Sequence, residues 1–202
     1  TITAFGSTGY TLGADSSDYG VNYLGSPNTY VSWTFRKQPK FFDIVTYTGN
    51  GSTSTRNISH NLKSVPGVII VKPVSASGDW KFSHTDGHTL LLNTTDAALT
   101  SPTLSGGYAS GGYSTYFQLV PYGGSTSAIN ANGVTYVAYL FAHNAGGFGL
   151  TGTDNVISCG SFTTDGSGNA TVNLGYEPQW VLMKKTNNVG SGGNDQWMLL
   201  DT

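Results

Sequence analysis

Two histidines and one aspartate lie close together in the sequence and could bind a metal ion. His84, Asp86 and His88 fall within five residues, and imidazole nitrogens and carboxylate oxygens are ligands that zinc accepts. A turn in this segment would bring the three side chains onto one cation. The alternative is a polar hairpin tip in which His84 ends a strand, because no further His or Cys follows at a known zinc spacing.

Acidic residues could also form the paired carboxyl groups of a glycoside hydrolase. The chain has ten Asp and a single Glu, and the acids that we consider are Asp79, Asp86 and Glu177. The Gly-x-Ser-x-Gly elbow, the Walker loop and the His-Glu-x-x-His motif are all missing from the sequence. We therefore expect no catalytic residues, no enzymatic activity and no cofactor, and we keep a polysaccharide depolymerase as the third hypothesis only.

Aromatic residues are the candidates for ligand recognition. Residues 105–115 form a segment of Gly, Ser and Tyr that contains Tyr108 and Tyr113, and Tyr116 follows directly. A tyrosine ring gives a large, stiff contact area that ends in a hydroxyl group, so it suits binding to a glycan or to a partner subunit. Trp80 and Trp197 are further candidates for an exposed aromatic platform. The alternative is a surface loop whose tyrosines lie back on a sheet.

The composition predicts an all-β protein that neither binds nucleic acid nor inserts into a membrane. Only 10% of the residues are charged and the net charge is -2, so we expect no basic surface for nucleic acid or anionic lipid. Gly contributes 28 residues, Tyr 12 and Phe 9, whereas the strong helix formers Glu, Lys, Arg and Gln are scarce. No apolar run reaches the roughly 18 residues of a membrane-spanning helix.

The pattern of apolar residues predicts antiparallel strands that build a β-sandwich. Residues 67–72 are apolar on both faces. We therefore expect a central strand there, with Pro66 at its entrance, where a missing N–H group is tolerated. The other predicted strands cover residues 42–47, 80–84, 90–92, 116–120 and 170–174, together with 29–35 and 135–141.

Parts of the sequence recur, which predicts a repeated unit of about 110 residues. Four residues have identical counterparts 112 positions later, namely Asn61 and Asn173, Leu62 and Leu174, Pro66 and Pro178, and Lys72 and Lys184. Each block then runs through a Gly-containing turn to a tryptophan. We divide the chain into the back part of one unit (1–40), a complete unit (41–147) and the front part of a further unit (148–202). Physically, this predicts two β domains, at 1–147 and 148–202.

Residues 29–35 and 135–141 read TYVSWTF and TYVAYLF, and we interpret them as equivalent strands. Side chains alternate between the two faces of a strand, and we assign the face that both stretches share to the core. This face consists of Val31, Trp33, Phe35, Val137, Tyr139 and Phe141. The opposite face changes from Ser32 and Thr34 to Ala138 and Leu140, so we expect the second strand to be covered more completely.

Three segments resemble a repeated module of large structural proteins in marine tailed bacteriophages, where the module often lies beside concanavalin-A-like lectin domains. The first is residues 136–143 (YVAYLFAH), and the second is residues 42–72 with the words FDIVTYTGNG, HNL and PGVIIVK. The third is residues 156–184 with VISCGSF and NLGYEPQWVLMK.

The resemblance implies that the chain is part of a tail fibre, a capsid fibre or another virion appendage. Its location would be the virion surface, outside the cell. Its partners would be other virion proteins and further copies of itself in a homo-oligomer, with a trimer as one form. Attachment to a host-surface glycan would accompany this structural role, and a stand-alone glycan-binding module is the alternative.

Overall fold

The computed structural model describes residues 2–14, 29–30, 32–99, 104–105, 113–120, 127–187 and 196–201. The chain divides into two compact units, Thr1–Phe35 and Arg36–Thr202. In the first unit, β1 (Ile2–Phe5) and β2 (Tyr10–Leu12) form an antiparallel hairpin. The boundaries predicted at residues 40 and 147 from the repeated sequence stay predictions.

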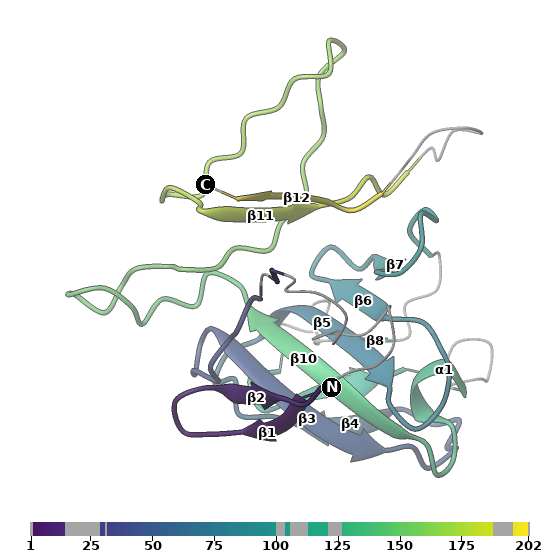
Figure 1. The fold of residues 1–202 in the computed structure, drawn as a ribbon. Coiled ribbons are helices and arrows are strands. Elements are labelled where there is room, and N and C mark those ends of the chain that lie inside the picture. The colour runs from purple at the N-terminus through teal and green to yellow at the C-terminus, as the bar shows by residue number, and fades with distance from the viewer. Residues whose placement is uncertain are drawn as a thin grey trace. The chain divides into compact units, whose positions relative to one another are not determined.

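A five-stranded antiparallel sheet organises the second unit (Figure 1). Its order is β3 (Phe42–Thr48), β10 (Thr135–Ala142), β5 (Pro66–Pro73), β6 (Lys81–His84) and β7 (Thr89–Leu91). β5 lies in the middle of the sheet and Pro66 is buried at its first position, as the apolar run predicted. The corresponding five strand predictions are confirmed to within one or two residues.

A three-stranded sheet completes the sandwich. It contains β4 (Arg56–Ser59), β9 (Tyr116–Leu119) and β8 (Leu104–Ser105), in that order. Apolar side chains from both sheets meet in one buried cluster, which we call the main core. It consists of Tyr47, Ile58, Leu62, Ile69, Val71, Phe117, Leu119, Ile129, Tyr136, Ala138, Leu140 and Ala142. The structure thus confirms the predicted all-β, antiparallel, sandwich-like fold.

The short helix α1 (Ser127–Asn130) packs into the main core. Ile129 is fully buried, and its carbonyl oxygen accepts a hydrogen bond of 2.8 Å from the hydroxyl group of Tyr47. The chain after the helix passes very close to the turn that follows β3. A Cβ atom added to Gly49 would lie 2.1 Å from the carbonyl oxygen of Ala131, so only a residue without a Cβ fits there.

The five-stranded sheet is also covered on the face that points away from the main core. Val68, Phe82 and Leu90 form a second buried cluster on this outer face, and Cys159 and Trp197 pack against it. This double coverage explains why β5 is a continuous apolar run and not an alternating one.

A separate hairpin follows in the second unit. β11 (Trp180–Met183) and β12 (Met198–Asp201) form a two-stranded antiparallel sheet. The predicted strand at residues 170–174 is wrong, because the structure has no strand at these residues. They follow a hydrogen-bonded turn in which the N–H group of Asp165 donates to the carbonyl oxygen of Asn169 at 2.8 Å.

The two similar stretches at 29–35 and 135–141 have different structures. Residues 135–141 lie in β10 as predicted, whereas the described residues of 29–35 are not in a strand, and Val31 lies outside the described residues. Trp33 is 56% exposed and Phe35 49% exposed, so their assignment to the core is wrong. A strand needs neighbours that complete its hydrogen bonds, and β10 has β3 and β5 on its two sides.

The core face of β10 is also different from the predicted one. Val137 is buried, but Tyr139 and Phe141 are only half-buried on the outer face. Ala138 and Leu140 belong to the main core and have no exposed surface. The expectation that this opposite face is covered more completely in the second stretch is confirmed, because Ser32 and Thr34 are exposed.

Candidate functional site

His84, Asp86 and His88 meet at the tip of the β6–β7 hairpin, but not as metal ligands. The Nδ1 atoms of His84 and His88 lie 3.1 and 3.0 Å from the same carboxylate oxygen of Asp86. The N–H group of His88 also donates to this oxygen at 2.9 Å. The described residues contain no group of three His, Cys, Asp or Glu side chains that could hold a metal ion. The metal-site prediction is therefore wrong, and the polar hairpin tip is correct.

The electrostatics of this tip favour an ionised Asp86. Burial acts to raise the pKa of Asp86, but hydrogen bonds from both histidines and the charge of His84 outweigh it, so the pKa is below its ordinary value. The carboxylate thus serves as the acceptor that closes the turn between β6 and β7.

Two of the three tyrosine candidates, Tyr113 and Tyr116, lie at the start of β9 in the three-stranded sheet. Tyr116 begins β9, and its ring stacks on that of Tyr113 with 4.3 Å between ring centroids and 22° between planes. Both side chains are half-buried, and they pack against each other at the start of β9, the middle strand of this sheet. Tyr108 lies outside the described residues. Burial, and then the neighbouring Tyr113, raise the pKa of Tyr116.

The two tryptophan candidates have different surroundings. Trp80 stacks beside Tyr139 on the outer face of the five-stranded sheet, with 6.1 Å between ring centroids, and both rings are half-exposed. Trp197 packs on Phe82 at 4.8 Å and donates its Nε1–H to the carbonyl oxygen of Leu91 at 3.1 Å. Trp197 therefore joins the segment before β12 to the large sheet, while Trp80 and Tyr139 remain the better candidates for ligand contact.

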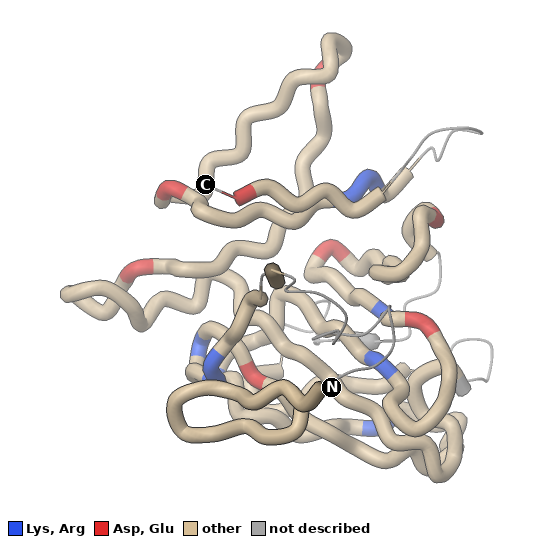
Figure 2. Tube along the Cα trace, viewed as in Figure 1, with Lys and Arg blue, Asp and Glu red and all other residues tan. Residues whose placement is uncertain are grey.

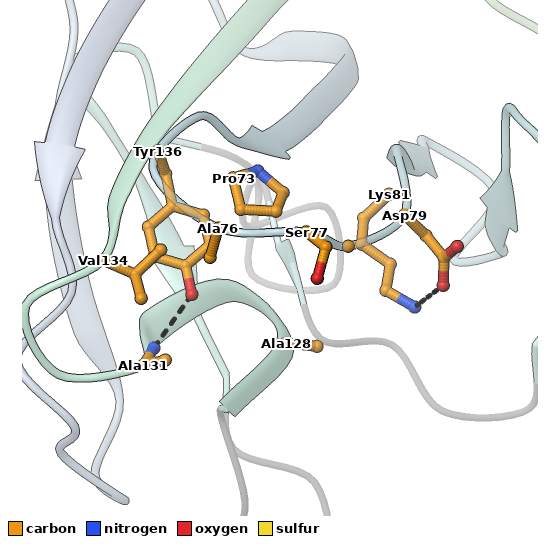
Figure 3. Close-up of a pocket in the computed structure, with 10 residues that line it drawn as sticks. Pro73, Ala76, Ser77, Asp79, Lys81, Ala128, Ala131, Val134 and Tyr136 are labelled. Carbon is orange, nitrogen blue, oxygen red and sulfur yellow. Dashed lines mark hydrogen bonds and ion pairs between the residues drawn. The ribbon is translucent and has the colours of Figure 1, made fainter.

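A small hollow of about 180 Å³ lies between the β5–β6 turn and the residues around α1 (Figure 3). Its polar groups include Lys81 and Asp79, whose Nζ and Oδ2 atoms are 3.8 Å apart. On the other side, the hydroxyl oxygen of Tyr136 accepts a hydrogen bond of 3.0 Å from the N–H group of Ala131. The remaining lining residues are Pro73, Ala76, Ser77, Gly78, Ala128 and Val134.

The hollow combines small side chains with one ion pair, so it suits a small polar group. Sequence reasoning missed it because its walls come from segments about 50 residues apart. The only local signal was the run of small residues at 75–78.

Asp79 and Asp86, two of the acids considered for glycoside hydrolysis, are too far apart to form a pair. Asp79 precedes β6 and Asp86 follows it, so the rise of a strand separates them by about 15–20 Å. Inverting and retaining enzymes need at most about 9.5 Å between their carboxyl groups. Glu177 is exposed in the segment before β11.

A buried ionisable pair near the start of the sandwich was not anticipated from the sequence. Asp43 is 4% exposed. Its carboxylate accepts a hydrogen bond of 2.7 Å from the N–H group of Asn61 and forms an ion pair with the Nζ atom of Lys37 at 3.1 Å. Burial opposes ionisation, but these contacts lower the pKa of Asp43 overall. His60 is 5% exposed and accepts a hydrogen bond of 3.2 Å at Nδ1 from the N–H group of Leu62. Burial lowers the pKa of His60, and the charge of Asp43 only partly offsets it.

We expect His60 to make the fold less stable in mild acid. The unfolded chain takes up a proton near the ordinary histidine pKa of about 6.5, whereas folded His60 still excludes it. Unfolding therefore binds protons, and stability falls as the pH decreases from 7 towards 5. His143 acts in the same direction, because burial and the nearby His84 lower its pKa.

Thermal unfolding between pH 7 and pH 5 measures this effect. The slope of melting temperature against pH should be shallower for His60→Gln than for the unmodified chain. Asn57→Ala, an exposed position whose side chain does not titrate, is the control and should leave the slope unchanged. Equal slopes for His60→Gln and the unmodified chain would contradict a lowered pKa of His60 in the folded state. The lowered pKa values of Asp43 and Asp86 change the stability of the fold only below about pH 4, outside this pH range.

The surface charge of the described residues is sparse and mixed. Figure 2 shows Lys and Arg interspersed with Asp and Glu along the trace, without a basic stripe among the described residues. In the same described part of the chain, no helix is long and apolar enough to cross a membrane.

A family model described as DUF7483, a domain of unknown function, matches residues 1–202. No curated protein and no solved structure matches the chain.

Proposed function

The chain belongs to the DUF7483 family, and we propose that it is a structural segment of a bacteriophage virion, in a tail fibre, a capsid fibre or another appendage. In this role the β-sandwich is a building block on the outer surface of the particle. It contacts further copies of the chain and other virion proteins. The resemblance of residues 42–72, 136–143 and 156–184 to a repeated phage module supports this setting.

The distribution of exposed apolar side chains carries the proposal. Of the fifteen large apolar side chains that are exposed among the described residues, fourteen lie within residues 2–35 or 148–201. Val74 is the exception, within the sandwich of residues 41–147. Large exposed apolar areas mark interfaces, and subunits of an assembly cover such surfaces for one another. Exposed apolar side chains in these two parts of the chain therefore suit a building block better than an isolated binding module.

Analysis of virions tests the structural role. We expect mass spectrometry to find peptides of this chain in gradient-purified particles of a bacteriophage that encodes it, and antibodies to the chain to label fibres or appendages. A chain that is present in infected cells but missing from purified particles would rule out the structural role. Particles from which the gene is deleted, grown in parallel, provide the control for antibody labelling.

Attachment to a host-surface glycan is the accompanying role, and the half-exposed pair of Trp80 and Tyr139 supports it. Aromatic rings contribute to sugar binding by stacking, at about 1 kcal/mol per ring. If a glycan array finds a ligand, Trp80→Ala should weaken its binding by about fivefold. Trp33→Ala, a substitution in the other unit, should leave it unchanged. An array without any ligand would remove the attachment role and leave the structural role in place.

A further inference from the structure

The hollow between the β5–β6 turn and α1 contains a lysine whose ammonium group has no hydrogen-bond partner among the described residues. Lys81 begins β6, and its side chain is only 14% exposed. Its Nζ atom forms an ion pair with Oδ2 of Asp79, but at 3.8 Å this contact is longer than a hydrogen bond. An ammonium group has three N–H donors, and a largely buried charge is costly unless hydrogen bonds satisfy it. An acceptor group of a ligand in the hollow would therefore be stabilised by Lys81.

The carboxylate of Asp79 is held in place from its other side. Its Oδ1 atom accepts a hydrogen bond of 3.1 Å from the side-chain amide of Asn93, whose own Oδ1 atom accepts one of 3.0 Å from the N–H group of Trp80. These bonds fix Asp79 next to the start of β6. The Oδ2 atom of Asp79 faces Lys81, and a carboxylate oxygen can accept a further hydrogen bond from a ligand.

The β5–β6 turn, which forms one wall of the hollow, is fixed at several points. The Nζ atom of Lys72 donates to the carbonyl oxygens of Pro73 at 3.1 Å and of Gly78 at 3.0 Å. The Oγ atom of Ser75 accepts a hydrogen bond of 2.9 Å from the N–H group of Thr135 at the start of β10. A Cβ atom added to Gly78 would lie 2.7 Å from Cγ of Pro73, so the turn packs directly on this proline. The wall is thus formed before a ligand binds, which lowers the entropic cost of binding.

The charges in the hollow indicate which kind of ligand it accepts. Among the described residues that line it, Lys81 and Asp79 are the only charged ones, and their charges cancel, so an anion is not favoured over a neutral molecule. Two neighbouring hydroxyl groups fit better, because a hydroxyl group both accepts and donates hydrogen bonds. One can accept from Nζ of Lys81 while the other donates to Oδ2 of Asp79. The remaining walls are mainly small or apolar and include Pro73, Ala76, Ala128 and Val134 (Figure 3).

We propose that this hollow binds one sugar residue of a glycan through two neighbouring ring hydroxyl groups, with Lys81 as the donor and Asp79 as the acceptor. Its volume of about 180 Å³ is below the roughly 300–1,000 Å³ of pockets that take drug-sized ligands, which limits the site to a single sugar ring. The apolar walls then contact the C–H groups of that ring.

The inference rests on the proposed attachment to a host-surface glycan for its biological meaning, and it adds a second contact to that role. Lys81 lies opposite Val71 of the main core, whereas Trp80 stacks beside Tyr139 on the outer face. The hollow and the aromatic pair are therefore on different faces of the five-stranded sheet, and each can be removed without the other.

NMR titration of the ¹⁵N-labelled chain with single monosaccharides tests the site. The sugars are glucose, galactose, mannose, fucose, rhamnose and N-acetylglucosamine, and acetate and inorganic phosphate are the anionic comparisons. For at least one sugar, we expect saturable shifts of the amide signals of residues 76–81. The dissociation constant should be about 1 mM or weaker, because a single ring offers few contacts. The absence of saturable shifts with all six sugars would overturn the proposal, as would tighter binding of an anion than of every sugar.

Substitution of the two charged residues tests their roles. Lys81→Met removes the ammonium group and should weaken sugar binding at least tenfold, because a charge-assisted hydrogen bond is lost. Lys63→Met is the matched control and should leave binding unchanged, since Lys63 is exposed and does not line the hollow. Asp79→Asn should weaken sugar binding about fivefold, whereas it would strengthen the binding of an anion by removing a negative charge. Equal effects of Lys81→Met and Lys63→Met, or stronger sugar binding by Asp79→Asn, would contradict these roles.

A substitution that fills the hollow separates binding there from binding elsewhere. Ala128→Leu leaves Lys81 and Asp79 in place but adds volume from α1. It should abolish the sugar-induced shifts without changing the circular dichroism of the fold, and shifts that persist would overturn the proposal. If a monosaccharide binds but the glycan array finds no ligand, the attachment role fails and the hollow stands as a sugar site. If the array finds a ligand whose binding depends on Trp80 and not on Lys81, the attachment role stands and the hollow alone fails.

Discussion

Replacement of Asn130 by alanine should lower the free energy of unfolding by about 2–4 kcal/mol. Asn130 ends α1 without any exposed surface. Its Oδ1 atom accepts hydrogen bonds from the Arg56 guanidinium at 2.9 Å and from the Asn50 N–H group at 3.1 Å. Its Nδ2 group donates to Asn50 Oδ1 at 2.8 Å and to the Ser52 carbonyl oxygen at 3.3 Å. Alanine removes all four bonds and leaves their partners poorly satisfied next to the main core.

Urea unfolding of the unmodified chain and of Asn130→Ala measures this decrease in the free energy of unfolding. Asn57→Ala is the matched control, because the Asn57 side chain is exposed and accepts one hydrogen bond from Gln118. It should change the free energy of unfolding by less than about 0.5 kcal/mol. If Asn130→Ala is as mild as this control, the helix is not held by the side chain of its last residue.

Replacement of Phe117 by alanine should lower the free energy of unfolding by about 3–5 kcal/mol. Phe117 lies in β9, the middle strand of the three-stranded sheet, and has no exposed surface. Its ring packs edge-on against the ring of Tyr47, with 6.3 Å between ring centroids. The substitution removes the transfer energy of the ring and leaves a cavity between the two sheets, which the rigid strands cannot close.

The control for this cavity is Phe162→Ala. The side chain of Phe162 is 52% exposed, so its removal should cost less than about 0.5 kcal/mol in the isolated chain. Chemical unfolding followed by tryptophan fluorescence compares the three proteins. A similar small loss for both variants would show that the two sheets are not held together through Phe117.

The strands of the sandwich were predictable because their signals are local. β5 is a run of Val and Ile bounded by Pro66 and Lys72, and β3 ends in a Gly-containing turn at Gly49. Such segments prefer the extended conformation and bury both faces wherever a sheet is available. The order of the strands was not predictable, because β10 reaches β3 across about 90 residues.

The wrong predictions concern residues whose secondary structure depends on partners that are distant in the sequence. Trp33 and Phe35 have nearly the same neighbours in sequence as Tyr139 and Phe141, yet only β10 has strands on both sides. Propensity alone does not make a strand without such partners.

The candidate site shows the same limit. The pattern around Asp86 predicted either a metal site or a polar hairpin tip, and the sequence could not show that the Nδ1 atoms of both histidines face the carboxylate oxygen of Asp86. The hollow beside Lys81 was not predictable, because its lining residues come together only when α1 packs next to the β5–β6 turn.

The position of β10 between β3 and β5 has a consequence for how the chain folds. Both neighbours of β10 are synthesised well before it, because β3 ends at residue 48 and β5 at residue 73, while β10 ends at residue 142. Until β10 has been synthesised, the apolar strands β3 and β5 lack the strand that pairs with both of them. Domains dominated by such non-local strand pairings fold slowly, in the range of milliseconds to seconds, and open strand edges tend to aggregate meanwhile. During translation, therefore, the nascent chain depends on its last sandwich strand to complete the domain.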